Sequence, residues 1–328
     1  MSCFRPSYVT FNRGQFGKFG GRLTQGVLDA YADSETEVVP VPCGHCIGCR
    51  LDRSKAWSDR MLLEYNTDRD TYSKHTALFV TLTYDEVSLP RFVCSDGMTR
   101  GNLNVVDIQN FMKRLRKFLN HKVRFFCAGE YGDTTFRPHY HMILFGCSLS
   151  DFPDIAVYSH DFELHQDLFF SPTLDRVWGK GSCKFCPASY GTMAYVAQYV
   201  IKKQFVCDNV DSFYRGRKPP FITMSRRPGI GSDFFGEDCF DDDLLVPSVA
   251  VNDGDDVHIV KIPRSYLEKL KLTNQDLYDN IMSNRRSLAS SADSFVKEQV
   301  GDRYFDYLRS CESSVYRRSK SLHNRNKV

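Results

Sequence analysis

Two apolar segments, residues 123–130 and 139–146, are separated by only eight residues and constrain the fold more than any other feature of the chain. Their sequences, VRFFCAGE and HYHMILFG, are rich in the aromatic and β-branched residues that favour strands. The segment between them, YGDTTFRP, carries the glycine, aspartate and proline typical of a turn. The pattern predicts an antiparallel hairpin in which Glu130 lies beside His139.

The remaining elements extend this hairpin into a sheet with helices. TALFVTLTYDE (76–86) predicts a further strand, and apolar residues at helical spacing predict helices at 50–66, 105–120 and 189–203. The order strand, helix, strand, strand, helix favours an α+β fold, with a central antiparallel β-sheet covered on one face by flanking helices. We expect a helical C-terminal extension, mostly helical over 261–312 and disordered in the tail.

Composition shifts along the chain predict three parts. Residues 1–37 are Gly-rich and polar, which indicates a loosely packed N-terminal arm. Residues 38–235 contain the predicted sheet and a Cys-rich insert. Residues 236–328 begin with an acidic linker and continue as a mostly helical C-terminal region with a basic tail.

The charge distribution allows a basic surface although the formal net charge is only +3. Basic residues concentrate in 100–124, 201–227 and the tail, whereas 233–256 is acidic. The sequence contains no apolar run of the roughly 20 residues that a membrane span requires, and no signal peptide. We therefore expect a cytoplasmic protein whose twelve cysteines are thiols or metal ligands.

His139 and His141 stand two residues apart at the start of the second hairpin strand. Residues two apart on a strand share a face, so both imidazoles point the same way as Glu130 on the paired strand. Two imidazole nitrogens and one carboxylate oxygen suit a catalytic divalent ion. Thr81, in the strand at 76–86, could line the sheet near this site. Edge histidines beside a turn would give the same pattern, and the residues leave both interpretations open.

Tyr195 and Tyr199 stand four residues apart in AYVAQYVIKK, on the helix expected at 189–203. This spacing places both hydroxyls on one face, and Lys202 and Lys203 extend that face by a turn. An aromatic stripe packed in the core would have the same spacing, although aliphatic residues of the helix already supply an apolar face. Paired tyrosines that face a metal site can cut DNA by transesterification.

Five motifs in order carry a resemblance to a known family. They are PCGHCIGCR (42–50), FVTLTYDE (79–86), GEYG with RPHYH (129–141), YVAQYVIKK (195–203) and MSRRPGIG (224–231). Together they resemble the HUH endonucleases that start rolling-circle replication, and most closely the gokushovirus-type replication initiators of the Microviridae, which are small single-stranded DNA phages. The resemblance fades before residue 38 and after about residue 235.

The resemblance implies an HUH nicking endonuclease domain over residues 38–235 that acts on single-stranded DNA at a replication origin. It implies that His139, His141 and Glu130 hold Mg²⁺ or Mn²⁺. The interval from the glutamate to the histidines is one residue longer than in several relatives, so the turn must absorb the difference.

The same family chemistry gives the tyrosines and Lys202 their expected roles. Tyr195 and Tyr199 would be the nucleophiles, and Lys202 would assist across the scissile phosphate. The products would be a 5′-phosphotyrosine adduct and a free 3′ hydroxyl. Because the phosphoester bond is exchanged, no ATP is required, and GKGS at 179–182 lacks the spacing of a Walker A loop. A helicase and a DNA polymerase would come from the host.

Binding to the DNA strand would rest on basic residues near the site. Those that we expect to contact phosphates are Lys203, Arg215, Arg217, Arg226 and Arg227.

Cysteines form three C-x2-C pairs. Cys43, Cys46 and Cys49 make two overlapping pairs, and Cys183 with Cys186 makes the third. This spacing is typical of structural zinc, with four thiolates from the two segments as ligands. Free thiols in a tight turn would have the same spacing, and both interpretations stay open. A zinc deaminase is excluded because its signature requires a His-x-Glu upstream of PCGHC, and residues 1–41 contain no histidine.

Other functions would use some of the same residues. A two-tyrosine transposase or a plasmid mobilisation nickase would use the same chemistry on another DNA. A non-enzymatic single-stranded DNA-binding protein would use the aromatic and basic residues for stacking and phosphate contacts. A metal-dependent hydrolase would use the histidines and water. Formation of a covalent protein–DNA adduct separates these possibilities.

Overall fold

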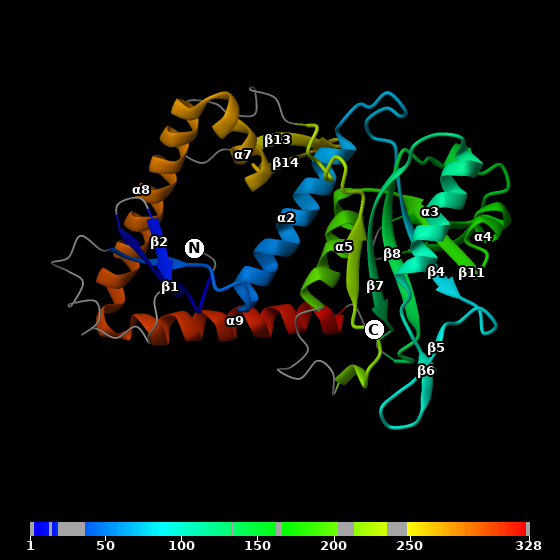
Figure 1. Cartoon of the computed structure of the whole chain (residues 1–328), viewed down its shortest axis with the longest axis horizontal. Helices are drawn as coiled ribbons and strands as arrows, with labels where there is room; N and C mark the ends of the chain where they lie inside the picture. The colour runs from blue at the N-terminus through cyan, green and yellow to red at the C-terminus, as the bar shows by residue number, and fades with distance from the viewer. Residues whose placement is uncertain are drawn as a thin grey trace. The chain divides into compact units, whose positions relative to one another are not determined.

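The computed structural model describes residues 3–12, 15–18, 37–132, 134–161, 166–202, 213–234 and 248–325 (Figure 1). The chain forms two compact units. One combines Met1–Asp52 with Arg286–Val328, and the other comprises Arg53–Arg285. The boundaries that the sequence suggested near residues 37 and 235 stay a prediction.

The second unit contains a seven-stranded antiparallel sheet in the order β12-β7-β8-β4-β11-β10-β9. The strands are β4 (Ala77–Tyr84), β7 (Arg124–Tyr131), β8 (Pro138–Phe145), β9 (Ala156–Asp161), β10 (Gln166–Phe170), β11 (Gly181–Pro187) and β12 (Phe221–Met224). The expected hairpin is therefore confirmed as β7 and β8, and β8 lies between β7 and β4. The α+β class and the antiparallel sheet are also confirmed.

Helices alternate with these strands along the chain. They are α2 (Ile47–Tyr65), α3 (Val105–Leu119), α4 (Pro172–Trp178), α5 (Tyr190–Lys202), α7 (Arg264–Thr273), α8 (Gln275–Val300) and α9 (Tyr304–Arg325), with short 3₁₀ turns at Leu149–Asp151 and Gly301–Arg303. The three helices expected at 50–66, 105–120 and 189–203 correspond to α2, α3 and α5. The side chain of Asn104 caps α3 by accepting a hydrogen bond from the backbone N–H of Val106.

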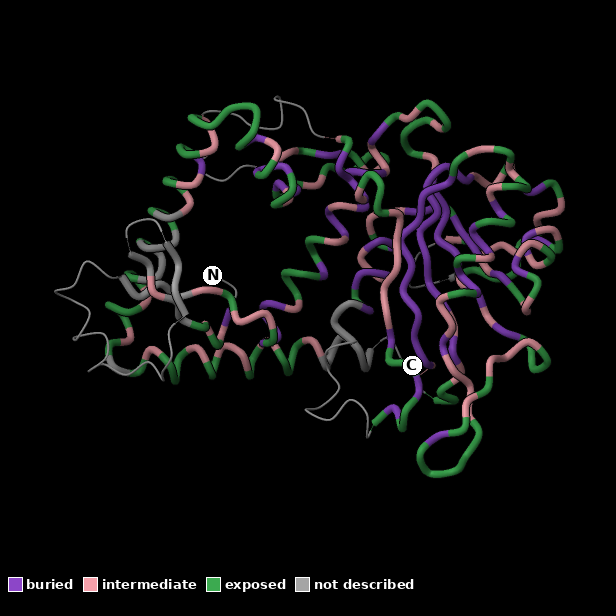
Figure 2. The backbone as a smooth tube through the Cα atoms, in the orientation of Figure 1, coloured by how far each residue is buried: buried purple, intermediate pink, exposed green. Residues whose placement is uncertain are grey.

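Helices cover both faces of the sheet, so the expectation of a single covered face was wrong (Figure 1). On one face, Phe126 and Ile143 pack with Met193 and Val196 of α5. On the other face, side chains of the sheet pack with α3 and with Trp178 of α4. The reason is visible in β7, which is buried along its whole length (Figure 2). A strand that is apolar at nearly every position requires cover on both sides.

Two small hairpins complete the Arg53–Arg285 unit. β5 (Arg91–Val93) pairs with β6 (Thr99–Gly101), and β13 (Ser248–Asp253) pairs with β14 (Asp256–Lys261). The β5–β6 hairpin follows β4 in the chain, and a Cβ on Gly101 would meet the ring of Pro138. This close approach places the hairpin against the start of β8.

The other unit contains a three-stranded sheet in the order β2-β1-β3. Its strands are β1 (Ser7–Asn12), β2 (Gln15–Lys18) and β3 (Glu37–Val41). Residues expected to form a loosely packed arm therefore include two paired strands. The expected disorder of the tail was also wrong, because α9 continues to Arg325. The helical prediction for 261–312 is confirmed by α7, α8 and α9.

Candidate functional site

The register of the central strands brings the predicted metal ligands together. Glu130 of β7 lies directly opposite His139 of β8, and Thr81 of β4 lies opposite His141. Because alternate residues of a strand share a face, all four side chains lie on the face that α5 covers. The turn between β7 and β8 is closed by a hydrogen bond from the backbone N–H of Gly132 to the carbonyl of Arg137.

The two imidazoles converge on one carboxylate. His139 Nε2 lies 2.9 Å from Glu130 Oε1, and His141 Nε2 lies 3.4 Å from the same oxygen. One ligand atom from each of the three residues fits within a sphere in which no pair is more than 4.8 Å apart. The donor set, two neutral nitrogens and an anionic oxygen, is one that divalent ions accept.

Contacts at the other ring nitrogens fix how the imidazoles are turned. His139 Nδ1 donates to the carbonyl of Arg137 over 3.2 Å, which leaves the lone pair on Nε2. His141 Nδ1 lies 3.0 Å from the hydroxyl of Thr81. Groups that hold the second nitrogen in this way orient metal-binding histidines and set their tautomer. Both Nε2 atoms therefore face Glu130.

Helix α5 places both tyrosines over this cluster. The ring of Tyr199 stacks flat on His141, with centroids 4.9 Å apart and planes at 4°. The ring of Tyr195 meets His141 edge-on at 5.3 Å and Tyr199 edge-on at the same distance. Phe79 of β4 packs against both His141 and Tyr195. The i, i+4 spacing thus brings both tyrosines to one imidazole.

The two tyrosines differ in their surroundings. Tyr199 is only 5% exposed, whereas Tyr195 is half-buried. Burial raises the pKa of the Tyr199 hydroxyl far above its ordinary value, and the negative charge of Glu130 raises this pKa further. Tyr199 is therefore a neutral phenol in this arrangement, and its ionisation would require a positive charge beside it.

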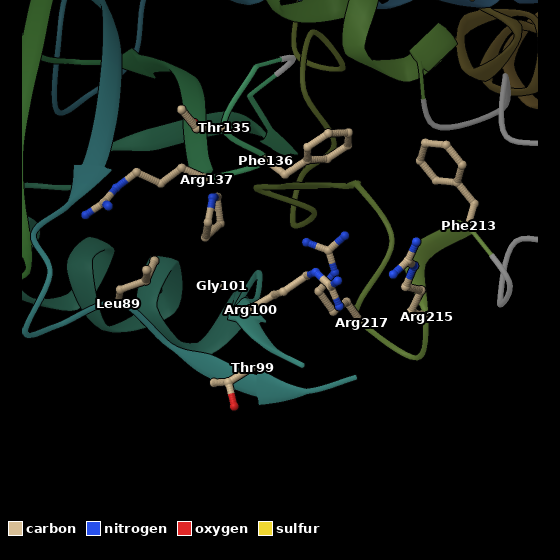
Figure 3. A pocket seen from close by; sticks show the side chains of 11 residues that line it. Leu89, Thr99, Arg100, Gly101, Thr135, Phe136, Arg137, Phe213, Arg215 and Arg217 are labelled. Carbon is tan, nitrogen blue, oxygen red and sulfur yellow. The ribbon is translucent and has the colours of Figure 1, made fainter. Parts of the chain in front are cut away.

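The predicted basic residues fall in different places. Lys202 is the last residue of α5, and Lys203 lies outside the described residues. Arg226 and Arg227 are exposed just after β12. Arg215 and Arg217 line a cavity of about 800 Å³ beside the start of β8 (Figure 3).

Sequence reasoning missed three residues of this cavity. Arg100, Phe136 and Phe213 line it together with the two predicted arginines. These residues come from the β5–β6 hairpin, the β7–β8 turn and the segment before β12, and no short motif joins them. The one available signal was the aromatic residue in the turn YGDTTFRP.

The structure divides the predicted cysteines differently from the sequence pattern. Cys43, Cys46 and Cys49 lie together, and the fourth cysteine beside them is Cys3. Cys183 and Cys186 are not brought together, because residues three apart on β11 leave opposite faces of the sheet. Burial raises the pKa of the Cys183 thiol, which donates to the backbone carbonyl of Leu174. A C-x2-C spacing on a strand cannot chelate one ion in this way.

Comparisons with known proteins give a consistent relationship. Residues 77–204, from the start of β4 to just beyond α5, match the model of a family of replication-associated proteins that is named after ORF2. The chain is 29% identical over 322 residues to the replication-associated protein ORF2 of Spiroplasma virus 4, and the match covers 94% of this chain and 93% of the relative. No solved structure matches.

Two further relatives come from other phages. The replication-associated protein VP4 of Bdellovibrio phage phiMH2K is 28% identical, over 70% of this chain and 66% of the relative. The replication-associated protein ORF4 of Chlamydia phage 1 is 29% identical, over 63% of this chain and 49% of the relative. The resemblance to phage replication proteins of the Microviridae type, which the five motifs predicted, is confirmed.

Among the helices that the structure describes, none is long and apolar enough to cross a membrane.

Proposed function

We propose that this chain, similar over 94% of its length to a phage replication-associated protein, is a replication initiation endonuclease of the HUH type. It nicks single-stranded DNA at an origin by tyrosine transesterification and so starts rolling-circle replication of a small single-stranded DNA phage genome. The observation that carries this proposal is the position of two tyrosine rings within 5.3 Å of an imidazole that belongs to a His–His–Glu cluster.

The covalent step requires one tyrosine oxygen to attack the scissile phosphorus. A bond from that oxygen to phosphorus forms, and the bond from phosphorus to the 3′ oxygen breaks. The 5′ phosphate stays joined to the tyrosine. The proton lost by the phenol balances the proton gained by the 3′ oxygen, which leaves as a hydroxyl. The energy of the phosphoester bond is kept for later rejoining, so the step needs no nucleotide cofactor.

The residues on the α5 face of the sheet fit a divalent ion. His139 and His141 would supply Nε2, and Glu130 would supply a carboxylate oxygen. When bound, Mg²⁺ or Mn²⁺ would neutralise charge on the scissile phosphate and lower the pKa of a nearby tyrosine. Thr81 and the Arg137 carbonyl hold the imidazoles in the orientation that such binding requires. Lys202, at the end of α5, would assist at the phosphate.

Substitution of the histidines tests the proposal directly. His139→Ala and His141→Ala should each abolish nicking, because each removes one of the three ligands. Binding to single-stranded DNA should stay within a few-fold of wild type, because the arginines are untouched. The measurement is incubation with Mn²⁺ and a labelled single-stranded origin oligonucleotide, followed by a denaturing gel that resolves the covalent adduct.

His160→Ala provides the matched control. His160 is an exposed histidine of β9 that pairs with Asp167, far along the sheet order from β8. This variant should form adduct at the wild-type rate. Wild-type nicking by the His139 and His141 variants in Mn²⁺ would show that the metal assignment is wrong.

The same assay separates the alternatives. A metal-dependent hydrolase would cut the oligonucleotide without leaving protein attached to it. A non-enzymatic single-stranded DNA-binding protein would shift the oligonucleotide on a native gel and leave no adduct. A transposase or a plasmid mobilisation nickase would form adducts on other DNA sequences. We expect adducts on the phage origin, with the helicase and polymerase supplied by the host.

A further inference from the structure

Four cysteine sulfurs that lie in one unit of the chain form a cluster unrelated to the tyrosine site. We propose that Cys3, Cys43, Cys46 and Cys49 bind a structural zinc ion, with Cys3 as the fourth ligand. Three of the four side chains are buried, and Cys43 is half-buried. This proposal does not depend on the proposed nicking activity.

The separations between the sulfur atoms match one tetrahedral ion. Cys3 Sγ lies 3.8 Å from Cys46 Sγ, and Cys43 Sγ lies 4.0 Å from Cys49 Sγ. All four sulfurs lie within 4.8 Å of one another. A tetrahedron with Zn–S bonds of about 2.3 Å has sulfurs about 3.8 Å apart. A disulfide would require about 2.0 Å, and an iron–sulfur cluster would spread its thiolates over several irons.

Backbone N–H groups surround the sulfurs and donate to them. Cys46 Sγ accepts from the N–H of Phe4 at 3.4 Å, and Cys3 Sγ accepts from the N–H of Cys43 at 3.3 Å. Three more backbone donors lie within this segment: the N–H of His45 and that of Cys46 on Cys43 Sγ, and the N–H of Cys49 on Cys46 Sγ. Such bonds stabilise thiolate charge and orient metal-binding sulfurs.

The position of the cluster in the chain explains what the ion would do. Cys3 precedes β1 and Cys43 follows β3, and these strands are paired at that end through Ser7 and Val41. Cys49 lies in the first turn of α2. One ion would therefore fasten the end of a small three-stranded sheet to the start of a helix. Small sheets of this size need such a constraint for stability.

Metal content and ligand chemistry test this proposal. Wild-type protein should contain about one zinc ion per chain by elemental analysis, resistant to mild chelation. Protein refolded with Co²⁺ should show the thiolate-to-cobalt charge-transfer bands and the visible bands of a tetrahedral four-thiolate site. Cys3→Ser should lose most of the zinc and change the cobalt spectrum. Cys311→Ser, which alters a half-buried thiol of α9, should keep both.

Several outcomes would overturn the proposal. Folded wild-type protein without zinc, or protein with iron in place of zinc, contradicts it. Full zinc content and an unchanged cobalt spectrum in Cys3→Ser would exclude Cys3 as a ligand. If Cys3→Ser does not fold, the wild-type zinc content and cobalt spectrum still decide. Loss of zinc in His139→Ala would show that the metal sits in the other cluster.

A second, independent observation concerns the cavity beside β8 (Figure 3). Arg217 is 6% exposed, and its Nη1 has no hydrogen-bond partner among the described residues. Its guanidinium stacks 4.6 Å from the ring of Tyr131, and its Nε donates to the carbonyl of Tyr214. A buried guanidinium donor without an acceptor is costly unless a ligand completes it.

Other residues of the cavity point to the same kind of ligand. Phe136 and Phe213 are about half exposed, and the figure shows their rings near the guanidinium groups of Arg100 and Arg215 (Figure 3). Phe136 and Arg215 have positive φ angles of 51° and 53°. Non-glycine residues in this conformation are strained and are common at binding sites.

We propose that this cavity binds one nucleotide of the DNA strand beside the scissile phosphate, which rests on the proposed function. Arg217 would receive a backbone phosphate, with Arg100 and Arg215 close to it. An exposed phenylalanine would stack on the base. Arg137 and Pro138, which also line the cavity, directly precede His139. The strand could therefore pass from the cavity to the metal cluster.

Binding without metal tests this subsite. In buffer containing EDTA, Arg217→Gln and Phe136→Ala should each weaken binding of a labelled single-stranded oligonucleotide by about five- to tenfold, measured by fluorescence anisotropy. Arg217→Gln should also reduce the slope of log affinity against log salt concentration by about one. Arg91→Gln, on the same hairpin as Arg100, and Phe295→Ala, another exposed phenylalanine, should bind like wild type.

Two failures can be distinguished. Unchanged binding by Arg217→Gln and Phe136→Ala, with normal adduct formation by wild type, overturns the subsite and leaves the nicking proposal intact. Weakened binding in these variants, without any adduct in wild type, overturns the nicking proposal and supports the subsite.

Discussion

Tyr195 and Tyr199 contact the same imidazole but differ in burial, which makes their separate roles testable. Two tyrosines one helical turn apart could alternate, so that one holds the 5′ end while the other attacks the regenerated origin. Tyr195→Phe and Tyr199→Phe should each keep some adduct formation with a simple oligonucleotide. Each should lose circularisation of unit-length product, and the double variant should form no adduct.

The phenylalanine variants keep the ring contacts with His141, so their folding is a fair control. Thermal unfolding of both single variants should match wild type within a few degrees. If one variant forms no adduct and the other completes full rounds of replication, the enzyme uses one nucleophile. The second tyrosine would then be a packing residue.

The raised pKa of Tyr199 predicts a dependence of its reaction on pH. Burial, followed by the charge of Glu130, raises this pKa above its ordinary value of about 10. Because only the phenolate attacks, a higher pH supplies more nucleophile. In Tyr195→Phe, where Tyr199 acts alone, the single-turnover rate of adduct formation should rise about tenfold per pH unit from neutral to alkaline pH. A rate independent of pH over this range would exclude phenolate formation at Tyr199 as the limiting event.

Between elements, a buried charge network joins α2, β7 and the segment after β12. Glu64, fully buried, accepts from Arg124 Nε at 2.6 Å and from the backbone N–H of Gly231 at 2.8 Å. Arg69 and Tyr72 also contact this carboxylate. Glu64→Ala would leave the buried guanidinium of Arg124 without its charge partner. We expect the free energy of unfolding to fall by about 3–5 kcal/mol, measured by urea denaturation.

An exposed ion pair provides the comparison for this network. Glu268 of α7 pairs with Arg264 over 3.2 Å, and both side chains are largely exposed. Glu268→Ala should change the free energy of unfolding by less than about 0.5 kcal/mol. Equal effects of Glu64→Ala and Glu268→Ala would mean that the buried network does not stabilise the packing of these elements.

At the scale of the whole molecule, the two metal sites belong to different compact units, so metal removal should affect them separately. Strong chelation that removes zinc should increase amide hydrogen exchange in β1 and β3, because the ion would fasten their paired end. Exchange in β7 and β8 should stay slow, because these strands are buried on both faces of the large sheet. Added zinc should restore the protection, and unchanged exchange in β1 and β3 would argue against a structural ion.

The sequence by itself determined the features that depend on local periodicity. The strand period of two aligned His139, His141 and Glu130, because the short turn between β7 and β8 limits the possible register. The helix period brought Tyr195 and Tyr199 to one face of α5. These patterns required only that each segment form the element its residues favour, so the three candidate metal ligands and both tyrosines could be named in advance.

Tertiary structure alone decided the features that join distant segments. Cys3 lies 40 residues before Cys43 in sequence, and only the pairing of β1 with β3 brings it to the sulfur cluster. Cys183 and Cys186 looked equivalent to the other pairs, but a strand turns them to opposite faces. The cavity around Arg217 draws on three separate loops. No local pattern encodes such contacts, because they arise from strand order and from the burial of both sheet faces, which depend on the packing of the chain as a whole.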